Sequence, residues 1–210
     1  AKIAAKEGCR LVLTGRTEEK LAKAKQELPA AAQETAVFLL ADFTHIQAPA
    51  KLFAMCNERG LVVDILVNNA GAGLFGDHVD LQTEGVRHTL ESNVLALTEL
   101  CALFGKQMKE RKSGSILNIA STAGYQPLPH FAAYAASKAY VLHFSEALSA
   151  ELAPSGVTVT CYGPGPTGTN FFGGAGITQQ TTSAFNADGL ARVDDVAAYA
   201  WRALERKKMT

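Results

Sequence analysis

The chain has 210 residues, with 20 basic and 20 acidic side chains in balance, and 48% of its residues are hydrophobic. This composition is typical of one globular domain with a sizeable buried core, and it excludes a disordered or fibrous chain. Without a net charge the protein offers no strong field to a polyanion, so nucleic acid is not an expected partner.

Neither the cysteines nor the apolar runs point to a metal or a membrane. Cys9, Cys56, Cys101 and Cys161 stand far apart and form no CxxC pair or cysteine–histidine cluster, so we predict no metal site. They are typical of small core residues in a reducing compartment. No apolar run reaches the roughly 18 residues of a membrane span, and the N-terminus lacks a signal-peptide pattern. We therefore expect a cytoplasmic protein.

Short apolar runs alternate with helical patterns along almost the whole chain. The runs have the continuous hydrophobicity of strands that are covered on both faces of a parallel sheet. The predicted strands are 10–14, 35–40, 62–67, 115–119 and 157–162, and the predicted helices are 17–28, 46–59, 83–111, 131–153 and 193–206. Such alternation implies right-handed βαβ crossovers and a single α/β domain over 1–210, with a Rossmann-like doubly wound parallel sheet.

The chain begins part-way through this alternating pattern. Residues 1–7 have the pattern of a helix, Gly8 is its expected C-cap, and a strand begins at Arg10. A doubly wound dinucleotide domain ordinarily opens with a strand and a Gly-rich turn before that helix. Both are missing, and the chain stops just after its last helix. We expect a fragment of a longer protein, truncated at both ends; a true truncation that has lost cofactor binding is the alternative.

A tyrosine and a lysine lie four residues apart on a predicted helix, Tyr134 and Lys138. This spacing places both side chains on one face. A phenol has a pKa near 10, and a neighbouring ammonium group lowers it by stabilising the phenolate. The pair could therefore act as a general acid/base, although the same spacing is also common in surface pairs.

Two polar residues strengthen this interpretation. Ser121 follows the strand 115–119, where the carboxyl end of a strand faces the ligand crevice of an open α/β sheet. Its hydroxyl could hydrogen-bond a substrate oxygen. Asn93 lies inside a long predicted helix, where a buried amide needs a partner, and it could bridge a water to Lys138. Upstream, the Asn68-Asn69-Ala70-Gly71 run directly follows a strand, and such small residues allow a ligand to approach the backbone closely.

The order and spacing of these motifs resemble the short-chain dehydrogenase/reductase family over essentially the whole chain. The matching residues are Asn68 to Gly71, Asn93, Ser121, Tyr134, Lys138 and the run Pro164-Gly165-Pro166-Thr167-Gly168-Thr169. The resemblance implies a Rossmann-like fold and hydride transfer between a nicotinamide and a carbonyl or alcohol. The departure is the Gly-rich turn, which in the family holds the pyrophosphate at a helix N-terminus.

The resemblance also implies roles for individual residues. Tyr134 would exchange the proton at the substrate oxygen, and Ser121 would orient that oxygen. Lys138 would lower the Tyr134 pKa and hold the nicotinamide ribose, while Asn93 would position a relay water. Residues matching the rest of the cofactor site are Asp42 at the adenine, Asn68, Asn69, Ala70 and Gly71 along the adenosine, and Pro164, Gly165, Thr167 and Thr169 beside the nicotinamide.

The predicted strand 10–14 corresponds to the second strand of the family, and the residues at its end favour NADP over NAD. NAD enzymes of this fold place an acid there to bind the ribose hydroxyls. Here Gly15 takes that position and Arg16 follows, with a fork of donors suited to a 2′-phosphate. A solvated arginine at the start of a helix is the alternative.

Substrate identity should depend on a lid over 168–188 and on the loop 122–130. The apolar residues there could line a small-molecule site or belong to the core or a dimer contact: Tyr125, Leu128, Phe131, Phe171 and Phe172. His130 is expected at the pocket mouth as a loop residue rather than as a second acid/base.

Three hypotheses about function follow. The first is an oxidoreductase that forms a homodimer or homotetramer through its long apolar-faced helices, as the family does. The second is a non-catalytic Rossmann-like protein that senses NADP or acts as a scaffold, and the third is an epimerase or dehydratase that uses the same tyrosine and lysine. A sensor has no need of Asn93, Ser121, Tyr134 and Lys138 together, and this favours the enzyme.

Overall fold

The computed structural model describes residues 1–177 and 189–207. Strands in this part are β1 Val12–Gly15, β2 Val37–Leu40, β3 Ile65–Asn68, β4 Gly114–Ile119 and β5 Val157–Tyr162. The α-helices are α1 Lys2–Lys6, α2 Glu18–Gln26, α3 Ala30–Thr35, α4 Ala48–Glu58, α5 Thr83–Leu90, α6 Ala96–Glu110, α7 Ala132–Leu152, α8 Phe171–Gly174 and α9 Val193–Glu205. Shorter helical turns are η1 His78–Asp80, η2 Glu91–Leu95, η3 Thr122–Tyr125 and η4 Ala153–Ser155.

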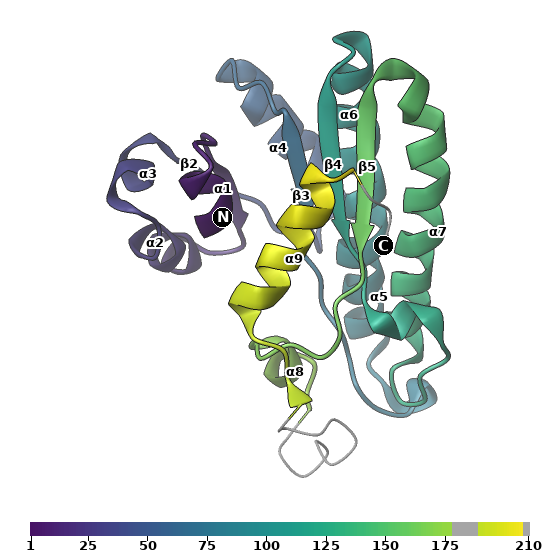
Figure 1. Ribbon diagram of the computed structural model, residues 1–210. Coiled ribbons are helices and arrows are strands. Elements are labelled where there is room, and N and C mark those ends of the chain that lie inside the picture. Colours follow the sequence, from purple (N-terminus) through teal and green to yellow (C-terminus); the bar gives the residue numbers. More distant parts are fainter. Residues whose placement is uncertain (178–188, 208–210) are drawn as a thin grey trace.

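The strands are all parallel and pair in two groups. β1 pairs with β2, and β3, β4 and β5 form a second sheet in that order. Figure 1 shows β1 and β2 with α1, α2 and α3 on one side of the molecule, and β3 to β5 on the other. The predicted parallel α/β fold is confirmed, with the difference that the described strands form two sheets rather than one.

Helices cover both faces of the larger sheet, as a doubly wound fold requires. α9 packs on the face formed by Leu117 and its neighbours, through Ala200 and Leu204. α4, α6 and α7 lie on the opposite face, and α9 crosses in front of the strands in Figure 1. The main buried cluster takes residues from β2, α4, α6, β4 and β5, so one core connects the two sheets.

The expected helix ends are confirmed at two places. Thr17 is the N-cap of α2, and its hydroxyl accepts a hydrogen bond from the N–H of Lys20 at 3.3 Å. Gly8 follows α1 with φ +79°. The N–H of Cys9 then donates to the Ala4 carbonyl at 2.9 Å, the pairing that closes helices on a left-handed glycine.

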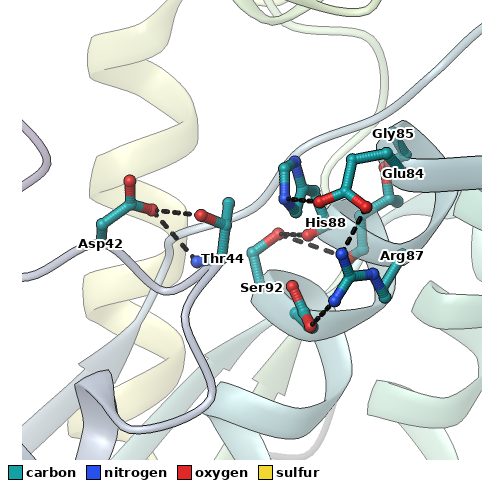
Figure 2. Close-up of polar contacts among 9 residues, drawn as sticks. Asp42, Thr44, Glu84, Gly85, Arg87, His88 and Ser92 are labelled. Carbon is teal, nitrogen blue, oxygen red and sulfur yellow. Dashed lines mark hydrogen bonds and ion pairs between the residues drawn. The ribbon is translucent and has the colours of Figure 1, made fainter.

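The predicted helix 83–111 is interrupted. α5 and α6 are joined by η2, a π-helical turn over Glu91–Leu95. Ser92 donates its hydroxyl to the carbonyl of His88 at 2.8 Å within this stretch (Figure 2). A π-turn widens the helix by one residue and is frequent at functional sites. Periodicity alone did not reveal it, because the apolar pattern continues on both sides.

A chain of buried polar side chains crosses the interior. Asn68, at the end of β3, donates to the Asn118 Oδ1 at 2.9 Å, and Asn118 donates to the Ser145 Oγ of α7 at 2.9 Å. Ser145 completes the chain by donating to the Val141 carbonyl at 2.6 Å. Asn118 and Ser145 are both fully buried. This chain fixes β3, β4 and α7 relative to one another, because each group would otherwise be buried without a partner.

We predict that Asn118→Ala destabilises the protein by about 2–3 kcal/mol, because it leaves buried polar groups of Asn68 and Ser145 with fewer partners. Urea denaturation measures this loss. The matched control is Asn57→Ala, which removes an exposed side-chain hydrogen bond with Gln107 and should change stability by no more than about 0.5 kcal/mol. Equal effects of the two substitutions would show that the buried chain contributes nothing beyond an exposed hydrogen bond.

Candidate active site

The carboxyl ends of the three strands of the larger sheet meet at one edge. Asn68 stands opposite Asn118, and Ile119 opposite Tyr162. Two backbone bonds continue this alignment beyond the strands: Ala120 N–H to the Tyr162 carbonyl at 2.8 Å, and Thr122 N–H to the Pro164 carbonyl at 3.0 Å. The segments that follow β3, β4 and β5 therefore lie together, where ligands of open α/β sheets bind.

The structure brings the side chains of Ser121 and Tyr134 close enough for Ser121 to influence the pKa of the tyrosine. Ser121 is the N-cap of η3 and accepts from the N–H of Ala123 at 3.2 Å, which fixes its side chain at the end of β4. Tyr134 comes from the first turn of α7. Gly124 allows this approach, because a Cβ at that position would lie 2.8 Å from the carbonyl carbon of Lys138.

Tyr134 is buried beneath aromatic rings. Its ring centroid lies 4.7 Å from that of Phe131 and 5.0 Å from that of Phe171. Burial raises the pKa of Tyr134, and the hydrogen bond from Ser121 offsets this only in part. Lys138 is not among the causes of this shift, so its expected effect on the Tyr134 pKa stays a prediction.

Lys138 is buried with its ammonium group beside Tyr134. The Nζ lies 5.8 Å from the centroid of the Tyr134 ring and donates to the Ile119 carbonyl at 2.9 Å. Burial lowers the pKa of Lys138 to about 8, against a small opposing effect from the Cys161 thiol. An ammonium has three donors, and Ile119 is its one hydrogen-bond acceptor within residues 1–177 and 189–207. The group is therefore charged at neutral pH and has unused donors.

Asn93 lies in η2 and is almost fully buried. Its amide Nδ2 donates to the Ala72 carbonyl at 2.9 Å, and its Oδ1 accepts from the Ala72 N–H at 2.8 Å. Nδ2 also donates to the Ser137 Oγ at 2.9 Å. Asn93 thus holds the segment after β3 against α7. A Cβ on Gly71 would lie 3.1 Å from Asn93 Oδ1 and 3.6 Å from Lys138 Nζ, so both groups flank this glycine.

The expected adenosine-side residues divide into two groups. Asn69, Ala70 and Gly71 are exposed at the edge of the sheet, as a ligand-binding wall requires. Asn68 is different, because its amide is buried against Asn118 and the Cys101 thiol. Its side chain supports the wall from behind, and direct contact with a cofactor stays a prediction for this residue.

Asp42 and Arg16 lie near each other at the carboxyl ends of β2 and β1. Asp42 accepts hydrogen bonds from the Thr44 hydroxyl at 2.9 Å and the Thr44 N–H at 3.1 Å (Figure 2). Burial raises the pKa of Asp42, but the two hydrogen bonds from Thr44 and the charges of Arg16 and His45 outweigh it, and the pKa is lowered. The carboxylate is therefore ionised, and the exposed Arg16 is close enough to interact with it.

The run after β5 turns along the same edge. Thr167 donates to the Gly165 carbonyl at 2.9 Å and forms a parallel bridge with Ala191. Thr169 accepts from the N–H of Phe171 at 3.2 Å and so leads into α8. Pro164 is fixed through its carbonyl by Thr122. Residues 178–188 of the expected lid lie outside the described residues.

Four of the five apolar residues named for the loop and lid gather in one buried cluster with Tyr134, and their role as a substrate wall stays a prediction. Phe131 and Phe171 contact Tyr134, and Phe172 and Leu128 pack against the same buried cluster. Tyr125 is exposed and lies outside this cluster. His130 is an exposed loop residue that hydrogen-bonds to Asp77.

Sequence reasoning missed three residues that support the site. Ser137 accepts from Asn93 and donates to the Tyr134 carbonyl at 2.6 Å. A side chain at Gly73 would clash, because its Cβ would lie 2.8 Å from Phe171 Cζ. Asn118 anchors Asn68 from β4. For two of these residues the sequence position could have indicated a role near the site. Ser137 is three residues after Tyr134 on the same helix, and Asn118 is three residues before Ser121.

Within residues 1–177 and 189–207, no helix is long and apolar enough to cross a membrane. The same residues contain no cluster of three or more histidine, cysteine or acidic side chains that could hold a metal ion.

Comparison with known proteins agrees with this geometry. The family model described as short chain dehydrogenase matches residues 1–180. The chain belongs to the short-chain dehydrogenase family. Among solved structures, a short-chain dehydrogenase from Sphingobium yanoikuyae in complex with NADPH superposes with a TM-score of 0.86 at 30% identity, covering 99% of this chain and 79% of that one. A bulky-bulky ketone specific alcohol dehydrogenase from Comamonas testosteroni superposes at 0.84 with 26% identity, over 99% of this chain and 77% of that one.

Relatives by sequence are longer proteins. "Probable oxidoreductase EphD" of Mycobacterium tuberculosis is 32% identical over 186 residues, which are 88% of this chain and 31% of that protein. The mouse 17-beta-hydroxysteroid dehydrogenase type 3 is 34% identical over 165 residues, 76% of this chain and 52% of that protein. This short-chain dehydrogenase chain thus spans between a third and about half of the length of these relatives.

The lowered pKa of Lys138 predicts a pH-dependent stability. The folded state releases the Lys138 proton near pH 8, whereas 10.5 is the ordinary pKa of the group. Between these values the unfolded chain binds more protons, so the free energy of unfolding rises with pH. Relative to Lys138→Met, the parent should gain up to about 1.4 kcal/mol per pH unit above pH 8, and nothing below it.

Urea denaturation from pH 7 to 10 measures this difference. The exposed Lys106, replaced by Met, is the matched control, because it removes a lysine from the surface rather than from the interior. A constant difference between the parent and Lys138→Met across the whole range would contradict the prediction.

Proposed function

We propose that this protein is an NADP(H)-dependent oxidoreductase that interconverts a carbonyl and an alcohol, with Tyr134 as general acid/base. The observation that carries the proposal is the meeting of the Ser121 and Tyr134 side chains at one sheet edge, with the Lys138 ammonium 5.8 Å from the tyrosine ring. Two hydroxyls and a buried cation at one sheet edge are what a carbonyl oxygen needs when charge develops on it. Membership of the short-chain dehydrogenase family supports the same conclusion.

The residues present fit a nicotinamide cofactor. Gly71 is exposed beside Asn93 and Lys138, so a ligand can approach its backbone from the solvent side. The unused donors of the Lys138 ammonium suit the hydroxyls of a ribose. Asn69, Ala70 and Gly71 would hold the adenosine side, Pro164, Gly165, Thr167 and Thr169 the nicotinamide side, and Asp42 the adenine. The cofactor would supply the hydride.

The proton chemistry follows from the burial of Tyr134. Its raised pKa keeps the proton on Oη at neutral pH, so the tyrosine is ready to donate it to a carbonyl oxygen. Ser121 would hold that oxygen within reach. The phenolate left behind is costly in an apolar site, and the charged Lys138 nearby would stabilise it. Asn93 would position a water through which the proton is restored.

Several features favour NADP. Arg16 is exposed at the end of β1 and interacts electrostatically with Asp42, which places its charge at the expected adenosine end. No acid occupies Gly15, the position at which NAD enzymes bind the ribose hydroxyls. The similar structure from Sphingobium yanoikuyae contains NADPH. We propose NADP as cofactor and NAD as the weaker one.

The non-catalytic alternative, an NADP sensor or scaffold, is less consistent with the site, because it gives no reason for the Ser121–Tyr134 contact.

We further propose a homodimer or homotetramer. Leu95 and Tyr140 leave apolar surface exposed at the start of α6 and along α7, the two helices expected to pair. The names of two relatives, a bulky-bulky ketone specific alcohol dehydrogenase and a 17-beta-hydroxysteroid dehydrogenase, support an apolar ketone or alcohol as the substrate.

We predict that Tyr134→Phe lowers the turnover number by about 10²–10⁴-fold with little change in NADPH affinity, because it removes the proton and keeps the ring. NADPH oxidation with a panel of ketones and aldehydes measures turnover, and fluorescence titration measures cofactor binding. Tyr140→Phe is the matched control on the same helix; it removes a hydroxyl bonded to Thr98 at 3.0 Å and should leave turnover unchanged. Turnover of Tyr134→Phe within about threefold of the parent would place the proton donor elsewhere.

We also predict that Arg16→Ala raises the Michaelis constant for NADPH by about tenfold or more and leaves that for NADH nearly unchanged, since it removes a charge-assisted phosphate contact. Initial rates with each cofactor measure the two constants. Arg59→Ala, at the exposed end of α4, is the control and should affect neither. Equal losses with both cofactors would show that Arg16 does not recognise the phosphate.

A further inference from the structure

His130 has a backbone conformation that requires outside support. Its φ is +61°, in the left-handed region that non-glycine residues seldom adopt. Two contacts with one neighbouring segment hold it there. The His130 carbonyl accepts from the Gly76 N–H at 2.8 Å, and its Nδ1 hydrogen-bonds to Asp77 Oδ1 at 2.6 Å. The turn at His130 is therefore set by residues 76 and 77, from a part of the chain more than fifty residues earlier.

The next residue carries this constraint to Tyr134. Phe131 directly follows His130, is almost fully buried and stands at the start of α7. Its ring lies 4.7 Å from Tyr134 and 5.8 Å from Phe75. The direction in which the chain leaves His130 thus determines where the Phe131 ring meets Tyr134.

The same early segment also holds the second ring over Tyr134. The Phe75 N–H donates to the Ala175 carbonyl at 2.9 Å, directly after α8, the helix that begins with Phe171. Gly73 leaves space for both rings, because a Cβ there would lie 2.8 Å from Phe171 Cζ and 3.0 Å from Phe131 Cζ. We call residues 73–77 the clamp segment.

We infer that the clamp segment, through the Asp77–His130 pair, determines substrate selectivity in favour of carbonyl compounds with an aromatic ring next to the carbonyl. This inference rests on the proposed function. The clamp segment fixes two phenyl rings against the ring of Tyr134, and aromatic rings prefer offset or edge-to-face contacts with other aromatic rings. The exposed polar side chains of Asp77 and His130 are paired with each other, and the rings of Phe131 and Phe171 form the apolar cluster beside Tyr134. Asp77 and His130 are positioning residues, because they act through Phe131.

The test compares binding of acetophenone and cyclohexyl methyl ketone, which carry the same carbonyl and rings of similar size. Dissociation constants from NMR titration should favour acetophenone by about three- to tenfold in the parent, since ring contacts add to burial. Asp77→Ala should bring the ratio to within about twofold of one. Asp77→Asn keeps an acceptor for Nδ1 and should retain most of the preference. Because the pair is exposed, Asp77→Ala should shift the melting temperature by no more than about 2 °C.

Two controls separate selectivity from general effects. Glu84→Ala removes a carboxylate–histidine pair of the same kind, with His88 on α5 at 2.8 Å (Figure 2), and should keep the parent ratio. Gly73→Ala should lose the preference by displacing the rings, whereas Gly173→Ala, where a Cβ meets nothing within 4 Å, should keep it.

The inference is overturned if the parent binds the two ketones equally or binds neither, or if Asp77→Ala keeps the parent ratio. Turnover of acetophenone with NADPH, measured in parallel, reports on the proposed function alone. A parent that binds acetophenone selectively but never reduces it would contradict the oxidoreductase and support the selective site.

Discussion

The candidate site depends on how one buried amide satisfies its hydrogen bonds. Asn93 binds both backbone groups of Ala72 and the hydroxyl of Ser137, so a single side chain joins the segment after β3, the turn η2 and the helix α7. An amide buried to this degree is costly unless its donors and acceptor are paired. Its partners are therefore confined to one arrangement, and Tyr134 and Lys138 on α7 are placed against the edge of the sheet as a result.

The π-turn at η2 makes this arrangement of Asn93 possible. Widening the helix by a residue lets Asn93 reach inward toward Ala72, while α5 and α6 continue on either side. Behind the edge, Asn68, Asn118 and Ser145 form a second chain of buried polar side chains. Each of them hydrogen-bonds to a partner on the next element, as Asn93 does. Two polar networks thus position the functional edge of a sheet whose interior is otherwise apolar.

Burial has opposite effects on the two titratable groups of the site, and together they suit proton donation. An apolar environment disfavours charge, so it raises the pKa of the Tyr134 phenol and lowers that of the Lys138 ammonium. At neutral pH the phenol holds its proton and the lysine stays charged. The proposed proton transfer would therefore start from a neutral phenol rather than from a phenolate.

The sequence by itself determined the alternation of strands and helices, the Thr17 and Gly8 helix ends, and the residues that gather at the sheet edge. These follow from local periodicity and from the rule that parallel strands end at one edge. The tertiary structure alone decided the π-turn, the inward direction of the Asn68 side chain, the aromatic cover of Tyr134 and the pairing of His130 with Asp77. Each of these depends on contacts between segments that lie far apart in the chain, and the direction of the Tyr134 pKa shift depends on the burial those contacts create. Spacing shows which residues can meet, whereas packing decides what surrounds them when they do.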